Sequence, residues 1–206
     1  MLHSTIIVLI TFVLASCQNS NSRTKGNNSL DANKTLAKMD QLLFQLDGLD
    51  ATDCNAIDRI VEVNERLRRE VENLRSVEEL DYMVDAHDPN SHEIGLIVSD
   101  DGNFALFSWQ TKMECLGQSI KNIAVFKSKN QLRISSLYGK PTLYSRISQE
   151  KETTGSNIYL LHSQKTKDSQ NIIIGYTISN GNLAEAQISN PIHLQHDYAI
   201  SEMENQ

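Results

Sequence analysis

The spacing of hydrophobic residues changes along the chain and divides it into four parts. An apolar run covers residues 6–14, and a polar stretch follows at 18–30. Between residues 31 and 86 apolar residues recur at every third or fourth position, which is the period of amphipathic helices. From residue 92 onward they alternate with polar residues, and β-branched and aromatic side chains become common, as in half-buried strands. The pattern therefore predicts an α+β fold, with helices preceding antiparallel strands.

The helical part, residues 31–86, is predicted to be an antiparallel hairpin. The first helix ends at Gly48, a residue typical of helix C-termini. The second helix begins near Asp53 and extends to about Leu74, with a continuation toward Met83. We expect the apolar stripes of both helices to pack on one face of the β domain.

Asn64 interrupts the apolar stripe of the second helix. One interpretation is a polar residue that sets the register of a helix–helix contact with a partner protein. The other is a position at the edge of the intramolecular helix interface, and this second interpretation is favoured.

The β part, residues 92–200, contains two dipeptides, Asp101-Gly102 and Asn180-Gly181, that are typical of tight hairpin turns. Residues 145–156 are polar and charged and are predicted to be a loop. We expect an antiparallel meander that forms one twisted sheet or an incomplete barrel, covered on one face by the helical hairpin. The expected strands are 94–99, 104–111, 120–127, 131–137, 157–163, 172–179, 183–188 and an edge strand at 192–200.

The first residues have the features of a secretion signal. The apolar run is too short to span a bilayer, and Leu-Ala-Ser-Cys at 14–17 follows it directly. Small residues before a cysteine predict a bacterial lipoprotein, in which 1–16 are removed and Cys17 carries fatty acyl chains such as palmitate. Residues 17–30 are then the lipidated cysteine and a flexible tether. An ordinary signal peptide that is cut elsewhere is the alternative.

Two further cysteines, Cys54 and Cys115, remain once lipid occupies Cys17. In an oxidising compartment an even pair favours a structural disulfide. Closing that loop would stabilise the fold by roughly 4 kcal/mol on the chain-entropy account. The alternative is two independent buried thiols. No histidine has the spacing to these cysteines that a zinc site requires.

The formal net charge is −7, and residues 1–16 contribute no charged side chain to it. An acidic chain without a long basic cluster argues against nucleic acid as a partner. It also argues against electrostatic binding to anionic lipid. The expected contact with a membrane is therefore the lipid on Cys17.

The sequence contains no catalytic motif that we can identify, and no catalytic residue, metal ligand or cofactor is predicted. Gly-x-Ser-x-Gly, phosphate-binding glycine loops and His-Glu-x-x-His are all missing from the chain. His193 and His196 lie three apart, which places them on opposite faces of a strand. A further group of potential metal ligands between the two parts is interpreted as a polar linker: Asp85, His87, Asp88 and His92.

Phe107 and Trp109 share one face of a predicted strand, and Phe104 points to the other face. The functional interpretation of this pair is an exposed aromatic surface that binds a glycan or a peptide. The alternative is a cross-strand pair in the core, against the strand at 94–99.

The stretch 99–109, SDDGNFALFSW, resembles a motif of envelope lipoproteins of the Bacteroidota. The resemblance extends over about residues 90–190, with 158–161 and 178–183 similar to the downstream strands. It implies an N-terminal helical region, a C-terminal β domain and an outer-membrane location, but no activity. Residues 110–112, Gln-Thr-Lys, depart from the acidic residue and glycine pair of the family. Because 18–29 contain no acidic residue, the resemblance favours the periplasmic side over the cell surface.

These observations predict a lipid-anchored envelope protein that acts as a non-enzymatic protein-interaction or structural module, with an envelope protein as its partner. A glycan- or peptide-binding module is the alternative. A hydrolase would need a nucleophile, a base and oxyanion donors that converge in one pocket. A lipoprotein that neutralises a toxin is compatible with the acidic charge.

Overall fold

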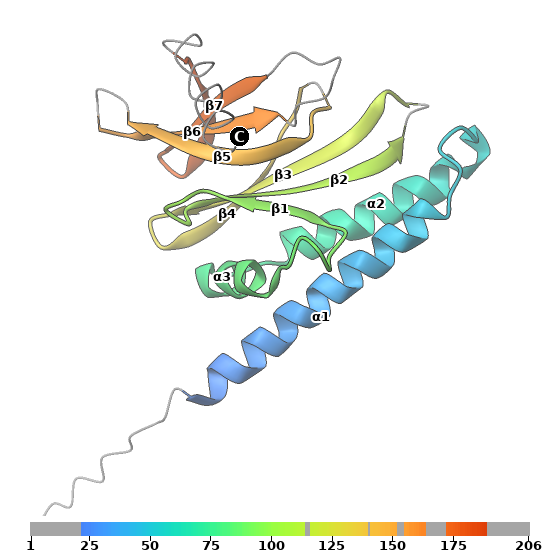
Figure 1. Ribbon diagram of the computed structural model, residues 1–206, viewed down its shortest axis with the longest axis horizontal. Coiled ribbons are helices and arrows are strands. Elements are labelled where there is room, and N and C mark those ends of the chain that lie inside the picture. The colour runs from blue at the N-terminus through green and yellow to red at the C-terminus, as the bar shows by residue number, and fades with distance from the viewer. Residues whose placement is uncertain (1–21, 114–115, 140, 152–154, 164–171, 189–206) are drawn as a thin grey trace, which may run out of the picture.

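The computed structural model describes residues 22–113, 116–139, 141–151, 155–163 and 172–188 (Figure 1). In this part of the chain the helices come first and all strands follow them, as the sequence predicts. The helices are α1 (Ser22–Asp47), the 3₁₀ turn η1 (Cys54–Ala56), α2 (Ile57–Glu72) and α3 (Val77–Ala86). The strands are β1 (Gly95–Val98), β2 (Phe104–Met113), β3 (Gln118–Ser128), β4 (Gln131–Ser136), β5 (Tyr144–Lys151), β6 (Asn157–Ser163), β7 (Ile173–Ser179) and β8 (Asn182–Ala186).

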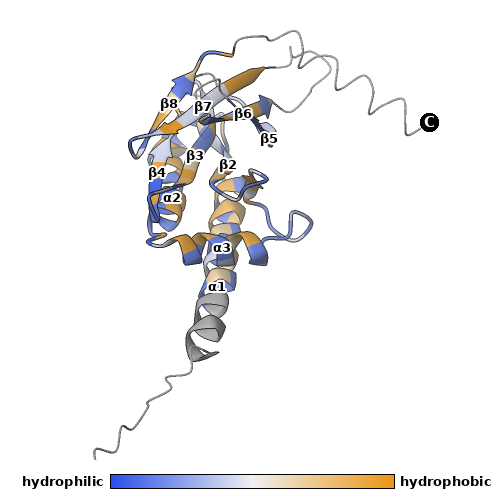
Figure 2. Ribbon diagram, turned by 90° about the vertical axis from the view of Figure 1, so that its left-hand side faces the viewer, coloured by the Kyte–Doolittle hydropathy of each residue, from blue (hydrophilic) through white to orange (hydrophobic). Residues whose placement is uncertain are grey.

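The elements form three layers, with the helices on one face of a first sheet and a second sheet on its other face (Figures 1 and 2). The first sheet has the order β1-β2-β3-β4 and the second β5-β6-β7-β8, and every described pairing is antiparallel. The α+β class and the antiparallel meander are thus confirmed. The strands form two unclosed sheets and not one twisted sheet, because the chain crosses from the first sheet to the second between β4 and β5.

The helical layer contains a third helix that the sequence analysis did not separate from the second. α2 ends at Glu72 instead of continuing to Leu74 and beyond. Ser76 then takes an extended backbone conformation, and its hydroxyl accepts a hydrogen bond from the Glu79 N–H at 3.2 Å. This N-cap satisfies a donor that a new helix start would otherwise leave unpaired, so α3 begins in a new direction at Val77.

The first sheet is buried on both faces. Ala105, Phe107 and Trp109 of β2 point to the helices, whereas Phe104 and Leu106 point to the second sheet. This alternation is the period of two that the sequence shows, and it confirms that Phe104 lies on the face opposite Phe107 and Trp109. One strand therefore contributes to both hydrophobic cores.

The predicted loop at 145–156 is wrong over β5, which is an edge strand of the second sheet. A bulge between Tyr144 and Arg146 inserts a residue, so Tyr144 and Ile147 are both buried in the inter-sheet core although they are three positions apart. Because of the bulge, buried and exposed residues do not alternate strictly along β5, and the sequence pattern therefore does not predict a strand here.

Asp101 connects the two sheets at the β1–β2 turn. Its carboxylate accepts hydrogen bonds from Ser99 Oγ at 2.7 Å and from Tyr159 Oη of β6 at 3.0 Å, besides the backbone N–H of Asn103. Burial alone would raise the pKa of Asp101, but these hydrogen bonds outweigh burial and lower it. Burial, together with the same bond to Asp101, raises the pKa of Tyr159 to about 12.

α1 begins at Ser22, within the segment predicted to be a flexible tether. Among the residues of α1 whose side chains the structure describes, 31–47, Ala32 is the first buried one. Figure 1 shows that this N-terminal end extends away from the three layers. The predicted strand at 192–200 lies outside the described residues.

Candidate functional site

Phe107 and Trp109, the predicted exposed aromatic pair, are core residues. Phe107 is fully buried and Trp109 is 3% exposed, both between the first sheet and the helices. The interpretation as an exposed aromatic platform is therefore wrong. Phe107 pairs with Leu96 of β1, as the alternative predicts, whereas Trp109 is buried in the same core beyond the end of that pairing. The physical reason is that α1 and α2 cover this face of β2, although Trp109 still lines a cavity between α1 and β2.

Asn64 holds that indole in place. Its carboxamide oxygen accepts the Trp109 Nε1–H at 2.8 Å, and its Nδ2 donates to the carbonyl oxygens of Ile60 and Thr111, each at 2.8 Å. The Asn64 side chain is buried. These bonds therefore replace those that water would make. The residue lies in the intramolecular interface, which agrees with the favoured interpretation, and no partner helix is needed to explain it.

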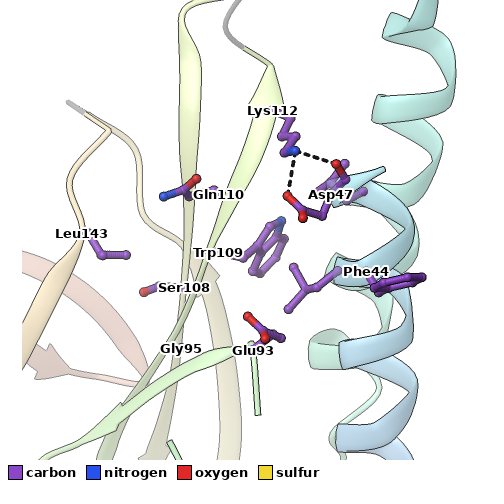
Figure 3. Close-up of a pocket in the computed structure, with 11 residues that line it drawn as sticks. Phe44, Asp47, Glu93, Gly95, Ser108, Trp109, Gln110, Lys112 and Leu143 are labelled. Carbon is purple, nitrogen blue, oxygen red and sulfur yellow. Dashed lines mark hydrogen bonds and ion pairs between the residues drawn. The ribbon is translucent and has the colours of Figure 1, made fainter. Parts of the chain in front are cut away.

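A groove between α1 and β2 encloses a cavity of about 450 Å³ (Figure 3). We call it the α1–β2 groove. Its walls come from the last turns of α1, from Glu93 and Gly95, from the second half of β2, and from Leu143. The size and the mixture of apolar and polar walls are typical of ligand sites.

The groove exists because β1 is much shorter than β2. The pairing between these strands ends at Gly95 and Ser108, whereas β2 continues to Met113. Before Gly95 the chain turns away from β2. The backbone N–H of Glu93 donates to Asp40 on α1 at 2.9 Å, so Glu93 does not continue the ladder. In the described part of the chain no strand pairs with residues 109–112 of β2 on the side of β1.

One wall of the groove is apolar and its two ends are acidic. Leu43, Leu46 and the indole of Trp109 form the apolar wall. Lys112 bonds the Asp47 carboxylate and the Asp47 carbonyl oxygen, each at 2.8 Å. A cation therefore caps the C-terminus of α1, where the helix dipole favours positive charge. Glu93 is exposed at the other end. Figure 3 shows the Lys112–Asp47 pair above Trp109 and Glu93 below it.

Phe44, 79% exposed, borders the same groove, but its ring points away from Trp109 in Figure 3. A large exposed aromatic residue beside a cavity is more informative than a buried one, because folding alone does not require it there. The helical period is the sequence signal for this exposure, because Phe44 lies off the stripe of buried residues on α1.

A second arrangement with chemical potential joins β5 and β6. Ser148 Oγ and His162 Nε2 lie 2.6 Å apart, and the imidazole is fully buried. Burial, and next to it the positive charge of Arg146, lowers the pKa of His162 to about 4. The imidazole is therefore neutral at pH 7. Sequence analysis missed this pair because Ser148 lies in the segment predicted to be a loop.

The predicted polar linker between the helices and the strands is ordered by hydrogen bonds. His92 Nδ1 lies 2.6 Å from Asp40 Oδ2, and His87 Nε2 lies 2.9 Å from the carbonyl oxygen of Ile94. The two imidazole rings stack with their centroids 5.7 Å apart. Among the described residues no group of His, Cys, Asp and Glu is arranged to hold a metal ion. His92 therefore bonds the segment between α3 and β1 to α1, and His87 bonds it to Ile94, the residue before β1.

Another cavity, of about 430 Å³, lies near the start of β2, whereas the α1–β2 groove lies near its end. Amides, hydroxyls and lysines form most of its lining. Of these, Lys127 is already bonded to Asp81 Oδ1 at 2.6 Å. With little apolar wall to exclude water from a ligand, it is the weaker candidate of the two.

Cys17 and Cys115 lie outside the described residues, as does the side chain of Cys54, so the lipidation and the disulfide stay predictions. His193 and His196 also lie outside them. None of the described helices is both long and apolar enough to cross a membrane.

Comparisons with models of protein families, with curated proteins and with solved structures find no match to this chain. The resemblance to Bacteroidota envelope lipoproteins therefore keeps its place as an expectation from sequence.

Proposed function

We propose that the chain is a lipid-anchored envelope lipoprotein, on the periplasmic side of the outer membrane, whose folded part binds another envelope protein at the α1–β2 groove. The anchor is Cys17, which follows the apolar run and the small residues at 14–16. The observation that carries the proposal is the position of the groove at the C-terminal end of α1, since Cys17 precedes the N-terminal end of that helix in the sequence.

The dimensions of α1 support this arrangement. Residues 18–21 between Cys17 and α1 span at most about 3.5 Å each, so the start of α1 lies close to the lipid. The helix has 26 residues, and Asp47, at the groove, is its last residue. With a rise of about 1.5 Å per residue, a helix of this length extends roughly 39 Å. A helix that leads from the anchor to the groove would present the groove away from the bilayer.

The lining of the groove favours binding over catalysis. Its apolar wall and exposed Phe44 offer surface for a partner, and its lysine, Lys112, is engaged by Asp47. The described lining residues do not place a nucleophile beside a base. Stacking of a glycan on an aromatic platform is not supported, because Trp109 is 3% exposed and Phe107 is fully buried.

A hydrolase is the second candidate, and the Ser148–His162 contact is the observation that favours it. It is weaker for two reasons. A histidine with a pKa of about 4 is a poor general base near neutral pH. Neither residue lines the α1–β2 groove, so the pair is not joined to the cavity that could hold a substrate.

Labelling of cells with an alkyne analogue of palmitate tests the anchor. We expect the wild-type chain to carry the label and to co-sediment with outer-membrane vesicles, and Cys17→Ser to lose both properties. Cys54→Ser is the matched control and should keep them. External protease should digest the chain only after the outer membrane is permeabilised. An unlabelled wild-type chain in the soluble fraction would contradict the proposal.

A further inference from the structure

We infer that the α1–β2 groove binds an extended segment of a partner protein as an additional strand beside residues 109–112 of β2, and that this segment has apolar side chains in its middle and Lys or Arg at its ends. The inference rests on the proposed function, since it specifies the partner segment for that groove. It is the mode of recognition in which an open strand edge supplies the backbone bonds and pockets supply specificity.

The backbone of β2 offers hydrogen bonds at this position. The Ser99 N–H donates to the Phe104 carbonyl at 2.8 Å, so Phe104 directs its backbone groups toward β1. In an antiparallel ladder every second residue directs its backbone N–H and C=O to the same neighbouring strand. The backbone groups of Leu106, Ser108 and Gln110 therefore lie on the side of β1. Ser108 pairs with Gly95 there. Gln110 is the next in this series, and it lies beyond the last described pair between β1 and β2.

On its other side β2 is already paired with β3. The backbone N–H and C=O of Gln110 therefore point toward the side of β1. Residues 104–110 of β2 pair in register with β3, and the Asn103 carbonyl accepts the Lys127 N–H at 2.8 Å. Asn103, Ala105, Phe107 and Trp109 therefore point their backbone groups to β3. The register with β3 shifts after Gln110, and the Thr111 carbonyl bonds Asn64 instead. The vacant edge is thus one short, defined stretch of backbone.

The dimensions fit a short strand. At about 3.3 Å per residue, a partner segment of four residues, called the guest below, spans roughly 13 Å beside residues 109–112. Its side chains would alternate between two walls. One set would contact Leu43, Leu46 and the indole on the α1 side, and the other would face Leu143 beyond β2. The apolar wall explains the preference for apolar residues in the middle of the guest.

The charges at the rim specify the ends of the guest. Glu93 is exposed beside Gly95, and the Asp47 side chain is 80% exposed at the other end even though it bonds Lys112. Asp50 and Asp53 follow in the connection to η1. Carboxylates at both ends attract cations and repel acidic segments, which gives specificity and faster association more than affinity.

The same charges argue against the chain's own C-terminal residues as the occupant. Residues 168–206 contain Asp and Glu but no Lys or Arg. A tail of that composition does not complement an acidic rim. A segment from a different protein is therefore the occupant that the groove favours.

The test uses the fluorescence of Trp109, which is the only tryptophan of the chain and lies at the groove. The probe is a blocked peptide of alternating valine and threonine with a lysine at each end. It is titrated into the full chain with Cys17→Ser in mild detergent, so that no lipid at this position is required. We expect a saturable change in Trp109 emission. A peptide with glutamate at each end should bind at least several-fold more weakly.

Two changes test the backbone pairing itself. N-methylation of alternate residues of the probe, on its edge facing β2, should weaken binding about tenfold or more, because it removes donors without removing side chains. Gln110→Pro removes the free N–H of β2 and should have a similar effect. Gln110→Ala keeps the backbone N–H and changes only the side chain, so it should bind more tightly than Gln110→Pro. The N-methylated probe remains informative if the proline variant does not fold.

Three outcomes would overturn the inference: no saturable change with the lysine-flanked probe, equal binding of the N-methylated probe, or tighter binding of a peptide that reproduces residues 190–201 of this chain. The last result would make the groove a site for its own tail. Palmitate labelling of Cys17 reports on the anchor independently, because the peptide titration is done without it. If the palmitate labelling fails, the peptide titration can still be interpreted, and the reverse also holds.

Discussion

The carboxamide of Asn64 on α2 is bonded to the indole of Trp109 on β2, with 2.8 Å between Oδ1 and Nε1, where the helices pack on the first sheet. The same carboxamide bonds the Thr111 carbonyl, which the irregularity in the β2–β3 pairing leaves available. One polar side chain thus fixes both the indole at the groove and the bulged end of β2. The α1–β2 groove depends on this contact for the position of its central wall.

Replacement of Asn64 by leucine should destabilise the fold strongly. It would leave the Trp109 N–H and the Thr111 carbonyl without their partner in a buried interface, at a cost of about 2–4 kcal/mol in the free energy of unfolding. Urea denaturation followed by circular dichroism measures this cost. Combining Asn64→Leu with Trp109→Phe should cost less than the sum of the single changes, since the second change removes the unpaired N–H. Additive costs would mean that the bond contributes nothing.

Asp101→Ala should also lower stability, because the carboxylate bonds the β1–β2 turn to Tyr159 of the second sheet. We expect a loss of about 1–3 kcal/mol. Asp100→Ala replaces an exposed residue of the same turn and is the matched control. It should lie within about 0.5 kcal/mol of the wild type. Equal effects of the two substitutions would contradict the role of Asp101 in joining the sheets.

His162 should make the fold less stable in acid. Its pKa is lowered from 6.5 to about 4 in the folded protein. Between these values the unfolded chain binds the proton more readily. The stability that His162 contributes is therefore complete above its unfolded pKa and is lost as the pH falls toward the folded one, at no more than about 1.4 kcal/mol per pH unit. Urea midpoints measured at neutral pH and at two mildly acidic values report this loss.

His162→Gln should flatten that pH dependence, because the titrating group is gone. Ser148→Ala removes the contact at 2.6 Å but keeps the imidazole, so it should preserve the dependence on pH while changing the overall stability. An unchanged profile in His162→Gln would assign the acid sensitivity to other groups.

Much of the fold follows from local sequence rules. The turns at Asp101-Gly102 and Asn180-Gly181 form where the dipeptides predict them, with positive φ angles of 65° at Gly102 and 82° at Gly181. β6 has the predicted bounds, and β2 places Phe104 and Phe107 on opposite faces. These features depend on neighbours in sequence, and the pattern therefore contains them.

The features that the sequence did not predict depend on tertiary structure. β5 was missed because a bulge places its two buried residues, Tyr144 and Ile147, three positions apart. The break before α3 follows from the cap at Ser76, which an apolar period does not register. The α1–β2 groove is the space left where β1 stops short of β2, and no residue type marks such a space in the sequence. The buried position of Trp109 follows from the helices that cover it.

The anchor at Cys17 is the central claim, since the location and the orientation of the groove depend on it. Mass spectrometry of the native protein, digested and analysed for its N-terminal peptide, tests it most directly. We expect a peptide that begins at Cys17 and carries the mass of a diacylglyceryl group and an amide-linked acyl chain. A peptide with residues 1–16 still attached and a free thiol at Cys17 would contradict the account.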